Sequence, residues 1–289
     1  MDLAKLKEMY ETQGYVVASG LLNGGDIDLL RSCVKRLTDD FAEKLLAEEK
    51  LVSGYKAEPF EQRIVSILEE SGASSPSWTN CFLGRELYDL VQCPHLVDGL
   101  ATLLGADVFF TGGYQLRAKQ PTRYHDRLTE FPWHQDTQYY GLHTQHLHII
   151  TAWIPLVDVD EDNGCLWFVP GSHTWGAFDG KRDELQNMRS AVDVEERGIA
   201  TAVPMKVGDV VFFHNLVFHS SQQNKTPLAR WNVDIRFSPT PGTGQESVEA
   251  KEASVVFAQK MEKSGKPSMV VKGQGAGISY EEWRVTTKC

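Results

Sequence analysis

The decapeptide FPWHQDTQYY, residues 131–140, sets a histidine and an aspartate two positions apart in a run rich in aromatic residues. This composition predicts a β-strand, and side chains two residues apart in a strand point to the same face. His134 and Asp136 are therefore expected to bind one ligand together. An imidazole and a carboxylate that share a face are suitable ligands for a divalent metal ion.

A third ligand is needed, because two side chains alone rarely hold a divalent cation against water. The segment GDVVFFHNLVFHSSQQNKTPLAR, residues 208–230, predicts a turn, a strand, a bend and a further extended run that carries His219. If Val217, His219 and Ser221 share the inward face of that run, His219 reaches the metal from a part of the chain remote from the first two ligands.

His134, Asp136 and His219 would form a two-histidine, one-carboxylate facial triad, the arrangement of non-haem Fe(II) oxygenases. Three ligands on one face of an octahedron leave three positions for a bidentate co-substrate and dioxygen. Eleven residues after His219 comes Arg230, which opens the predicted strand RWNVDIRF. A loop of this length can bring the guanidinium near the metal, where its fork geometry suits a carboxylate.

Other interpretations of the histidines stand beside this one. A lone HxD motif is more often a surface or hydrogen-bonded pair than a metal site. We expect His214, at the bend, to be structural or solvated, and His173 to lie in a turn. The cluster HTQHLH, residues 143–148, could itself bind metal, but it lies in a predicted loop without carboxylates, which favours a solvated or substrate-edge segment. The seven further histidines are His95, His125, His143, His146, His148, His173 and His214.

The elements that must position these residues change in character near residue 106. Before it, apolar residues recur at spacings of three and four, which predicts amphipathic helices. The helical segments are DLAKLKEMYETQ, DIDLLRSCVKRLTDDFAEKLLAEE, FEQRIVSILEES and HLVDGLATLLG. After it, short β-branched and aromatic runs are separated by Gly, Pro, Asn and Asp, which is typical of an antiparallel sandwich or barrel. These runs are DVFFTGGYQLRAKQ, HIITAWIPLVDVD, GCLWFVPGSH, GDVVFFHNLVFHSS and RWNVDIRFSP.

The segment VEAKEASVVFAQKMEK, residues 248–263, predicts a further helix, and KGQGAGISYEEW predicts a loop with a short terminal turn. The predicted fold class is α+β, with a jelly-roll (double-stranded β-helix) core, N-terminal helices packed on the sheet and a short helical C-terminal tail. We expect a single domain over residues 1–289, composed of a mainly helical part (1–105), the jelly-roll core (106–240) and a helix with the C-terminal tail (241–289).

Composition restricts the partners. With 42% hydrophobic and 24% charged residues, the chain is typical of a globular protein. The net charge of −10 disfavours nucleic acid, which requires a basic surface. Five cysteines without a CxxC pair indicate reduced thiols, and no apolar run approaches the roughly 18 residues of a membrane span. The sequence predicts a cytoplasmic protein with a small-molecule partner and no membrane contact.

These segments resemble the phytanoyl-CoA dioxygenase (PhyH) family of Fe(II)/2-oxoglutarate-dependent oxygenases. The resemblance covers roughly residues 106–237, together with the N-terminal opening YETQGYVVASGLL. Its matching segments are HQD at 134–136, AWIPLVDVDEDNGCLWFVPGSH at 152–173 and GDVVFFHNLVFHSSQQNKTPLAR at 208–230. The combination is much more specific than any one of the three.

The resemblance implies a role for each matching position. The implied ligands of Fe(II), where dioxygen would also bind, are His134, Asp136 and His219. The implied contacts of the co-substrate 2-oxoglutarate are Arg230 and Ser221 at its distal carboxylate, with Gln115 and Trp153 in the same pocket. Without the resemblance, Gln115 would be an ordinary polar residue of a strand and Trp153 a core aromatic residue. No catalytic side chain beyond the metal ligands is expected.

Two tyrosines, Tyr139 and Tyr140, follow the HxD motif and could line the substrate side. Aromatic residues at such positions are about as often packing residues.

A stripe of polar residues is the other candidate for substrate contact. By strand periodicity, Arg117 shares a face with Gln115, whereas Asn232, Asp234 and Arg236 share one with Arg230. A polar stripe that points into a barrel usually marks a ligand cavity, and the alternative is a buried ion pair between Asp234 and Arg236.

The expected activity is oxidation of an unactivated C–H bond of a small metabolite, with release of succinate and CO2 from 2-oxoglutarate. Asp136 favours hydroxylation, desaturation, epoxidation or rearrangement, because the related halogenases replace this carboxylate with a small residue. A branched fatty acyl-CoA is disfavoured, because the sequence shows no basic cluster for CoA phosphates. The alternatives are a jelly-roll zinc hydrolase, which leaves Arg230 unexplained, and a non-catalytic jelly-roll binding protein.

Overall fold

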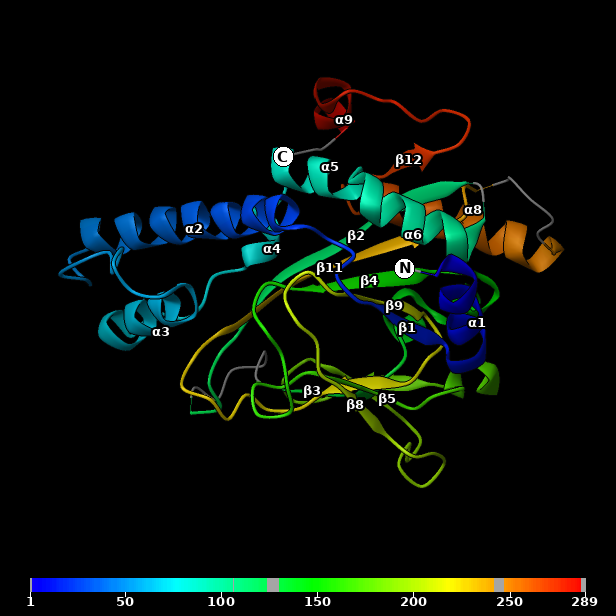
Figure 1. Ribbon diagram of the computed structural model, residues 1–289, viewed down its shortest axis with the longest axis horizontal. Helices are drawn as coiled ribbons and strands as arrows, with labels where there is room; N and C mark the ends of the chain where they lie inside the picture. Colours follow the sequence, from blue (N-terminus) through cyan, green and yellow to red (C-terminus); the bar gives the residue numbers. More distant parts are fainter. Residues whose placement is uncertain (1, 106, 124–129, 242–246, 287–289) are drawn as a thin grey trace.

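The computed structural model describes residues 2–105, 107–123, 130–241 and 247–286, so that His125 lies outside the described residues (Figure 1). Two antiparallel sheets lie one above the other, and helices cover the outer face of the larger sheet (Figure 1). The α+β class with a jelly-roll core is therefore confirmed.

The larger sheet has the strand order β1-β9-β4-β11-β2-β12, and the smaller one the order β3-β10-β5-β8. The strands of the larger sheet are β1 (Tyr15–Ala18), β2 (Val108–Lys119), β4 (Ile150–Pro155), β9 (Val210–His214), β11 (Arg230–Ser238) and β12 (Met269–Lys272). Those of the smaller sheet are β3 (Phe131–His134), β5 (Leu166–Phe168), β8 (Thr201–Val203) and β10 (His219–Ser221). A separate hairpin consists of β6 (Gly180–Arg182) and β7 (Met188–Ser190).

Most helices precede β2 in the chain. They are α1 (Leu3–Gln13), α2 (Gly24–Ala47), α3 (Phe60–Ser71), α4 (Trp78–Cys81), α5 (Arg85–Val91) and α6 (Pro94–Leu104). The later helices are α7 (Thr137–Tyr140), α8 (Val248–Lys263) and α9 (Tyr280–Thr286), with the short 3-10 helices η1 (Leu142–His146) and η2 (Ser172–Trp175). The first turn of α2 is fixed by a capping box, in which Asn23 and Asp26 each accept a hydrogen bond from the other's backbone N–H.

Strand β11 separates the apolar core from the polar interior of the jelly roll. Its odd-numbered residues from Trp231 to Phe237 pack in the core cluster that also contains the buried faces of the helices. Its even-numbered residues from Arg230 to Arg236 line the cavity between the sheets. The alternation of side chains along a strand thus delivers a row of polar groups to the interior while the opposite face anchors the helical layer.

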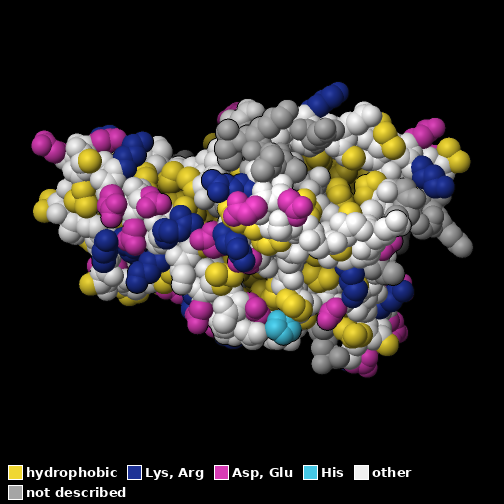
Figure 2. All heavy atoms as spheres, turned by 90° about the horizontal axis from the view of Figure 1, so that it is seen from above, with side chains coloured by type: hydrophobic (Ala, Val, Ile, Leu, Met, Phe, Trp, Pro, Cys, Tyr) yellow, Lys and Arg dark blue, Asp and Glu magenta, His cyan; other side chains and the backbone are white. Residues whose placement is uncertain are grey.

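The helical layer presents a mixed surface to solvent. In Figure 2, which views the molecule from the side on which α5 and α6 lie, basic and acidic side chains are interspersed with apolar ones. No helix in the described ranges is both long and apolar enough to cross a bilayer.

Several sequence predictions of elements are confirmed, and others are corrected. The predicted helix over 248–263 is α8, and the strands predicted around the site are present. Within the helical first third, Tyr15–Ala18 is a strand that pairs with β9. Strand Met269–Lys272 was also not predicted; it lies directly before the glycine-rich segment predicted as a loop, shares only Lys272 with it, and pairs with β2. Both additions are edge strands of four residues, too short for an alternating pattern to identify.

A glycine substitution tests how tightly the turn before β5 is packed. Gly164 has φ +82°, and a Cβ there would lie 2.5 Å from the Gln222 carbonyl oxygen and 3.0 Å from Lys119 Nζ. Gly20 also has a positive φ, +61°, but a Cβ there meets nothing within 4 Å. We expect Gly20→Ala to lower the free energy of unfolding by about 1–2 kcal/mol, and Gly164→Ala by roughly 1–3 kcal/mol more. Urea denaturation measures both; equal losses would contradict this packing.

Candidate active site

The candidate active site lies between the two sheets. Side chains from the smaller sheet and from the segment after β3 meet the inward face of the larger sheet around one cavity. Its lining includes His134, Asp136, His219, Ser221 and Arg230. Residues more than 90 positions apart in the sequence, such as His134 and Arg230, are thus brought to one place.

The two histidines of the candidate triad face each other across β3 and β10. His219 is paired in register with His134, and their ring centroids lie 4.2 Å apart. Nδ1 of His134 lies 2.7 Å from the Pro132 carbonyl oxygen, and Nδ1 of His219 lies 3.1 Å from that of Val217. Each Nδ1–H donates to a backbone carbonyl, so that Nε2 of each ring is available as a metal ligand.

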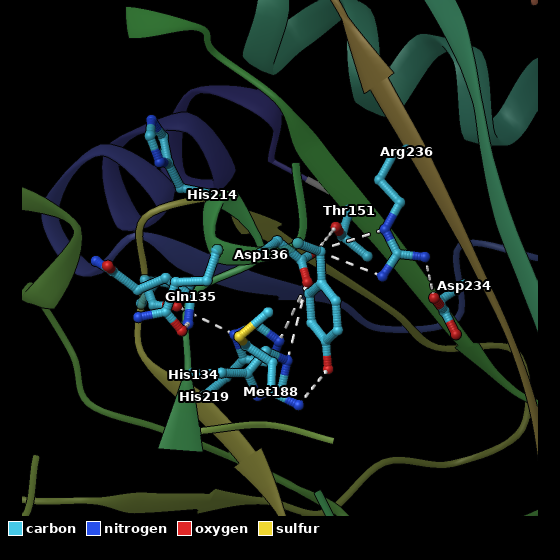
Figure 3. A network of polar contacts seen from close by, with 12 residues as sticks. His134, Gln135, Asp136, Thr151, Met188, His214, His219, Asp234 and Arg236 are labelled. Carbon is cyan, nitrogen blue, oxygen red and sulfur yellow. Dashed lines mark hydrogen bonds and ion pairs between the residues drawn. The ribbon is translucent and has the colours of Figure 1, made fainter. Parts of the chain in front are cut away.

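Asp136 completes the candidate triad. Its Oδ1 lies 3.9 Å from Nε2 of His134 and 3.7 Å from Nε2 of His219 (Figure 3). All three side chains are buried, and one ligand atom of each lies within 4.8 Å of the other two. Two imidazole nitrogens and one carboxylate oxygen are the donor set of non-haem Fe(II) enzymes, so these residues form a candidate iron site.

The strand expected over the whole HxD motif is wrong for its second half. Strand β3 ends at His134, and Asp136 has a helical backbone, φ −60° and ψ −31°, directly before α7. The chain turns at Gln135, whose buried side chain donates to the carbonyls of Gly176 and Leu216. The carboxylate therefore reaches the same centre as the imidazole through a turn and not through strand alternation.

Burial and neighbouring charges determine the protonation of the triad. Burial, reinforced by His219, lowers the pKa of His134 to about 3, and burial likewise lowers the pKa of His219. Burial alone would raise the pKa of Asp136, but Arg236 and the two histidines hold it well below its ordinary value. At neutral pH the triad is thus two neutral imidazoles and one carboxylate, the forms that bind metal.

The second oxygen of Asp136 is held from the opposite side. Thr151 Oγ1 donates to Oδ2 at 2.6 Å, and Nε and Nη2 of Arg236 both lie 3.4 Å from it (Figure 3). Arg236 in turn makes a short ion pair with Asp234. Oδ1 faces the histidines while Oδ2 is occupied, which favours coordination through a single carboxylate oxygen.

A chain of polar contacts follows the inward face of β11. Arg230 Nη1 donates to Asn232 Oδ1 at 2.9 Å, and Asn232 Nδ2 lies 3.3 Å from Asp234 Oδ1. Nε of Arg117, across the strand pair, also lies 3.3 Å from that oxygen. The cavity and the Asp234–Arg236 ion pair, which we predicted as alternatives, are both present, since all of these side chains line the cavity.

Arg230 is buried at one side of this cavity. It is 2% exposed, its guanidinium carbon lies 5.1 Å from the centre of the Trp153 ring, and its Nε has no hydrogen-bond partner among the described residues. Burial lowers the pKa of Arg230 to about 9, so that the group stays charged at neutral pH. Ser221 and Trp153 line the same cavity. A buried guanidinium with a free N–H is suited to an incoming carboxylate.

Of the remaining predicted residues, Tyr139 and Arg117 line the cavity, whereas Gln115 and Tyr140 are not part of its lining. Gln115 Oε1 accepts a hydrogen bond of 2.7 Å from Thr79 Oγ1. Tyr140 packs edge-on against Phe257 of α8, with ring centroids 5.3 Å apart.

Sequence reasoning missed Thr151 and Lys119. Thr151 lies two residues before Trp153 in β4, and strand periodicity from Trp153 could have placed it on the inner face. Lys119 continues the alternation of Gln115 and Arg117 in β2, and its Nζ donates to Ser221 Oγ at 2.6 Å. A lysine at a strand end is more often exposed, so periodicity alone does not place this one in the interior.

Other histidines have structural contacts. His148 Nε2 lies 2.9 Å from Tyr10 Oη, and the rings of His148 and His214 stack with centroids 5.2 Å apart. His173 Nε2 lies 3.1 Å from the Glu11 carbonyl oxygen. Within the described ranges, the one other group of three possible metal ligands is Asp26, Cys93 and His95, where Asp26 already caps α2.

A jelly roll that encloses two histidines and one carboxylate beside a buried arginine defines the class of Fe(II)/2-oxoglutarate-dependent dioxygenases, which are oxidoreductases. The model of the phytanoyl-CoA dioxygenase (PhyH) family matches residues 10–231. The chain belongs to this family, and the resemblance noted in the sequence is confirmed.

Curated relatives include enzymes with different names. The chain is 23% identical over 260 residues to peroxisomal phytanoyl-CoA dioxygenase of Homo sapiens, covering 84% of this chain and 72% of the relative. It is 25% identical over 252 residues to ectoine dioxygenase of Bordetella parapertussis, covering 82% of this chain and 75% of the relative.

Solved structures share the fold. The non-heme monooxygenase ThoJ, in its apo form, superposes with a TM-score of 0.60 at 22% identity, covering 94% of this chain and 85% of that one. The epimerase SnoN, solved with Fe3+, alpha ketoglutarate and nogalamycin RO, gives a TM-score of 0.53 at 21% identity, with 84% and 92% of the two chains covered.

The lowered pKa of His134 predicts a pH dependence of stability. The unfolded chain takes up a proton on this imidazole near pH 6.5, whereas the folded metal-free protein does so only at about pH 3. Unfolding free energy should therefore fall as the pH is lowered from about 6.5 toward 3, by up to about 1.4 kcal/mol per pH unit for this one group. We expect His134→Gln to show a shallower slope in urea unfolding of metal-free protein. Identical slopes of unfolding free energy against pH in the two proteins would contradict a neutral, buried His134.

The hydrogen bond from Thr151 predicts an effect on metal affinity. Thr151→Val removes a donor to Asp136 Oδ2 without a change of volume, so the carboxylate is less well oriented. We expect metal affinity, measured by competition with a chelator, to fall by about tenfold. The matched control is Thr38→Val, because Thr38 is a buried threonine that donates to a carbonyl inside α2. Equal affinities of the two variants would refute the orienting role.

Proposed function

We propose that this protein oxidises an unactivated C–H bond of a small-molecule metabolite, with conversion of 2-oxoglutarate to succinate and CO2. The observation that carries the proposal is the convergence of His134, Asp136 and His219 with the buried, incompletely paired Arg230 in one cavity. When bound at the triad, Fe(II) and 2-oxoglutarate would supply activation of dioxygen and oxidation of the substrate. The protein's side chains supply ligands, orientation and exclusion of water.

The residues divide into two sets by their place in the cavity. We assign the metal to His134, Asp136 and His219, and the distal carboxylate of 2-oxoglutarate to Arg230 with Ser221. Trp153 supports this assignment, because its ring lies beside the Arg230 guanidinium and limits where a carboxylate can approach. The carboxamide oxygen of Gln115 accepts from Thr79, so a contact of Gln115 with the co-substrate would come from its amide N–H group.

We place the oxidisable substrate against Tyr139 and Arg117. Tyr139 packs edge-on against the ring of His134, with centroids 5.3 Å apart, which puts it next to the candidate metal. Arg117 lies over the Phe131 ring at 4.8 Å, with a side chain 25% exposed, so it can meet a molecule that enters from solvent. Arg236 pairs with both Asp234 and Asp136, and we assign Asp234 and Arg236 to support of the metal site.

The identity of the substrate is not fixed by the family. The relatives' names point to phytanoyl-CoA, ectoine and nogalamycin, which differ widely in chemistry. The carboxylate of Asp136 favours hydroxylation, desaturation, epoxidation or rearrangement over halogenation. We propose that the chain over 1–289 works as one catalytic domain.

The proposal is tested by anaerobic reconstitution with Fe(II), followed by addition of 2-oxoglutarate, oxygen and a metabolite library. Succinate formation that a library member stimulates, and that Asp136→Ala abolishes, is the expected result. Retention of zinc with hydrolysis of a library member and no succinate would instead support a jelly-roll hydrolase. Binding of a ligand irrespective of metal or chelator would support a non-catalytic protein.

Removal of the Arg230 guanidinium should affect the co-substrate selectively. We expect Arg230→Ala to raise the 2-oxoglutarate concentration needed for half-maximal succinate formation by at least about 100-fold, because a buried charge partner is lost. Iron binding should stay nearly intact, since Arg230 contacts no ligand of the triad.

The matched control is Arg63→Ala. Arg63 is also buried, 5% exposed, but it pairs with Asp39 and is not part of the cavity lining. Its loss should destabilise the fold without a change in co-substrate requirement. An unchanged requirement in Arg230→Ala, or equal effects of both variants, would remove this role from Arg230.

A further inference from the structure

Lys119 is a buried cation that the assignments above do not use. It ends strand β2 and is 1% exposed. Its Nζ donates to Ser221 Oγ at 2.6 Å and to the carbonyl oxygen of Gln222, both of which are neutral acceptors. Among the ion pairs of the described residues, none includes Lys119.

An ammonium group in this position is energetically unfavourable without an anion. Burial, followed by repulsion from Arg230, lowers the pKa of Lys119 well below its ordinary value, and Glu130 and Cys165 oppose this shift only in part. Buried charges in proteins are normally paired, because desolvation of a lone ion is costly. Among the described residues no carboxylate forms an ion pair with Lys119, so a bound anion could supply the partner that is missing.

The position of Lys119 indicates which anion would bind beside it. In the register of β2 and β11, Lys119 lies directly opposite Arg230. Ser221, which accepts the hydrogen bond from Lys119, lines the cavity together with Arg230. Two buried cations thus lie opposite each other on β2 and β11; one donates to Ser221, and the other has an Nε without a hydrogen-bond partner among the described residues.

The hydroxyl of Ser221 connects the lysine with the cavity. Because its oxygen accepts from Lys119 Nζ, its own hydrogen must point elsewhere, and it now donates to the Gly164 carbonyl oxygen at 3.0 Å. A carboxylate beside Arg230 would be a stronger acceptor for this hydrogen than a neutral carbonyl. The positive charge behind the serine would favour that arrangement further.

We propose that Lys119 is a positioning residue of the co-substrate site, which orients the Ser221 hydroxyl and supplies a second positive charge behind the distal carboxylate of 2-oxoglutarate. The inference rests on the proposed function. Under this proposal, Arg230 and Lys119 together select a dicarboxylate over a monocarboxylate.

The test compares two co-substrates by calorimetry on Ni(II)-loaded protein. 2-Oxopentanoate replaces the distal carboxylate of 2-oxoglutarate with a methyl group and is otherwise the same molecule. Lys119→Met should weaken 2-oxoglutarate binding by about 10- to 100-fold, as expected for a lost charge-assisted contact. It should change 2-oxopentanoate binding by no more than about twofold. A purely structural role would weaken both ligands equally and would overturn the proposal.

A matched control and a second variant keep the result interpretable. Lys206→Met removes the same charge from an exposed site, 80% exposed, and should affect the binding of neither ligand.

If Lys119→Met does not fold, Arg230→Met with Lys119 intact decides the question. That variant should still prefer 2-oxoglutarate over 2-oxopentanoate by about tenfold, and loss of all preference would show that Lys119 contributes nothing. Failure of the wild-type protein to bind 2-oxoglutarate at all would contradict the proposed function itself.

Discussion

Strand β11 has one apolar face and one polar face, and the rest of the structure depends on this division. Trp231, Val233, Ile235 and Phe237 hold the helical layer, while the residues between them face the interior. A shift of one residue in its pairing with β2 and β4 would turn buried charges into the apolar core and expel the candidate co-substrate anchor from the cavity. Burial of the apolar face therefore fixes the geometry of the site.

The interior charges are connected to one another by ion pairs and hydrogen bonds. Arg236 lies between Asp234 and Asp136, and Asn232 connects Asp234 with Arg230. Isolated charges at this depth would be unfavourable, so the pairs are compatible with burial only as a connected set. Two interior cations have no ion pair among the described residues: Arg230, which lines the cavity, and Lys119, which lies opposite Arg230 and donates to Ser221. The proposed function requires a dicarboxylate beside them.

Much of this arrangement could be predicted from the sequence, because it depends on periodicity and spacing. The β11 stripe, His219 on its strand and helix α8 follow from local patterns. The turn that carries Asp136 could not be predicted in the same way, since it is held by hydrogen bonds from Gln135 to the remote residues Gly176 and Leu216. Thr151 and Lys119 acquire significance only through partners distant in the chain, Asp136 and Ser221.

The central claim is that one metal ion binds where these remote segments meet, with a dicarboxylate between it and the buried arginine. Diffraction from anaerobic crystals soaked with Fe(II) and 2-oxoglutarate, recorded at the iron absorption edge, tests it most directly. The account predicts one anomalous peak bonded to Nε2 of His134, Nε2 of His219 and Oδ1 of Asp136, with the distal carboxylate against Arg230. A peak at Asp26, Cys93 and His95 instead, or a co-substrate turned away from Arg230, would contradict it.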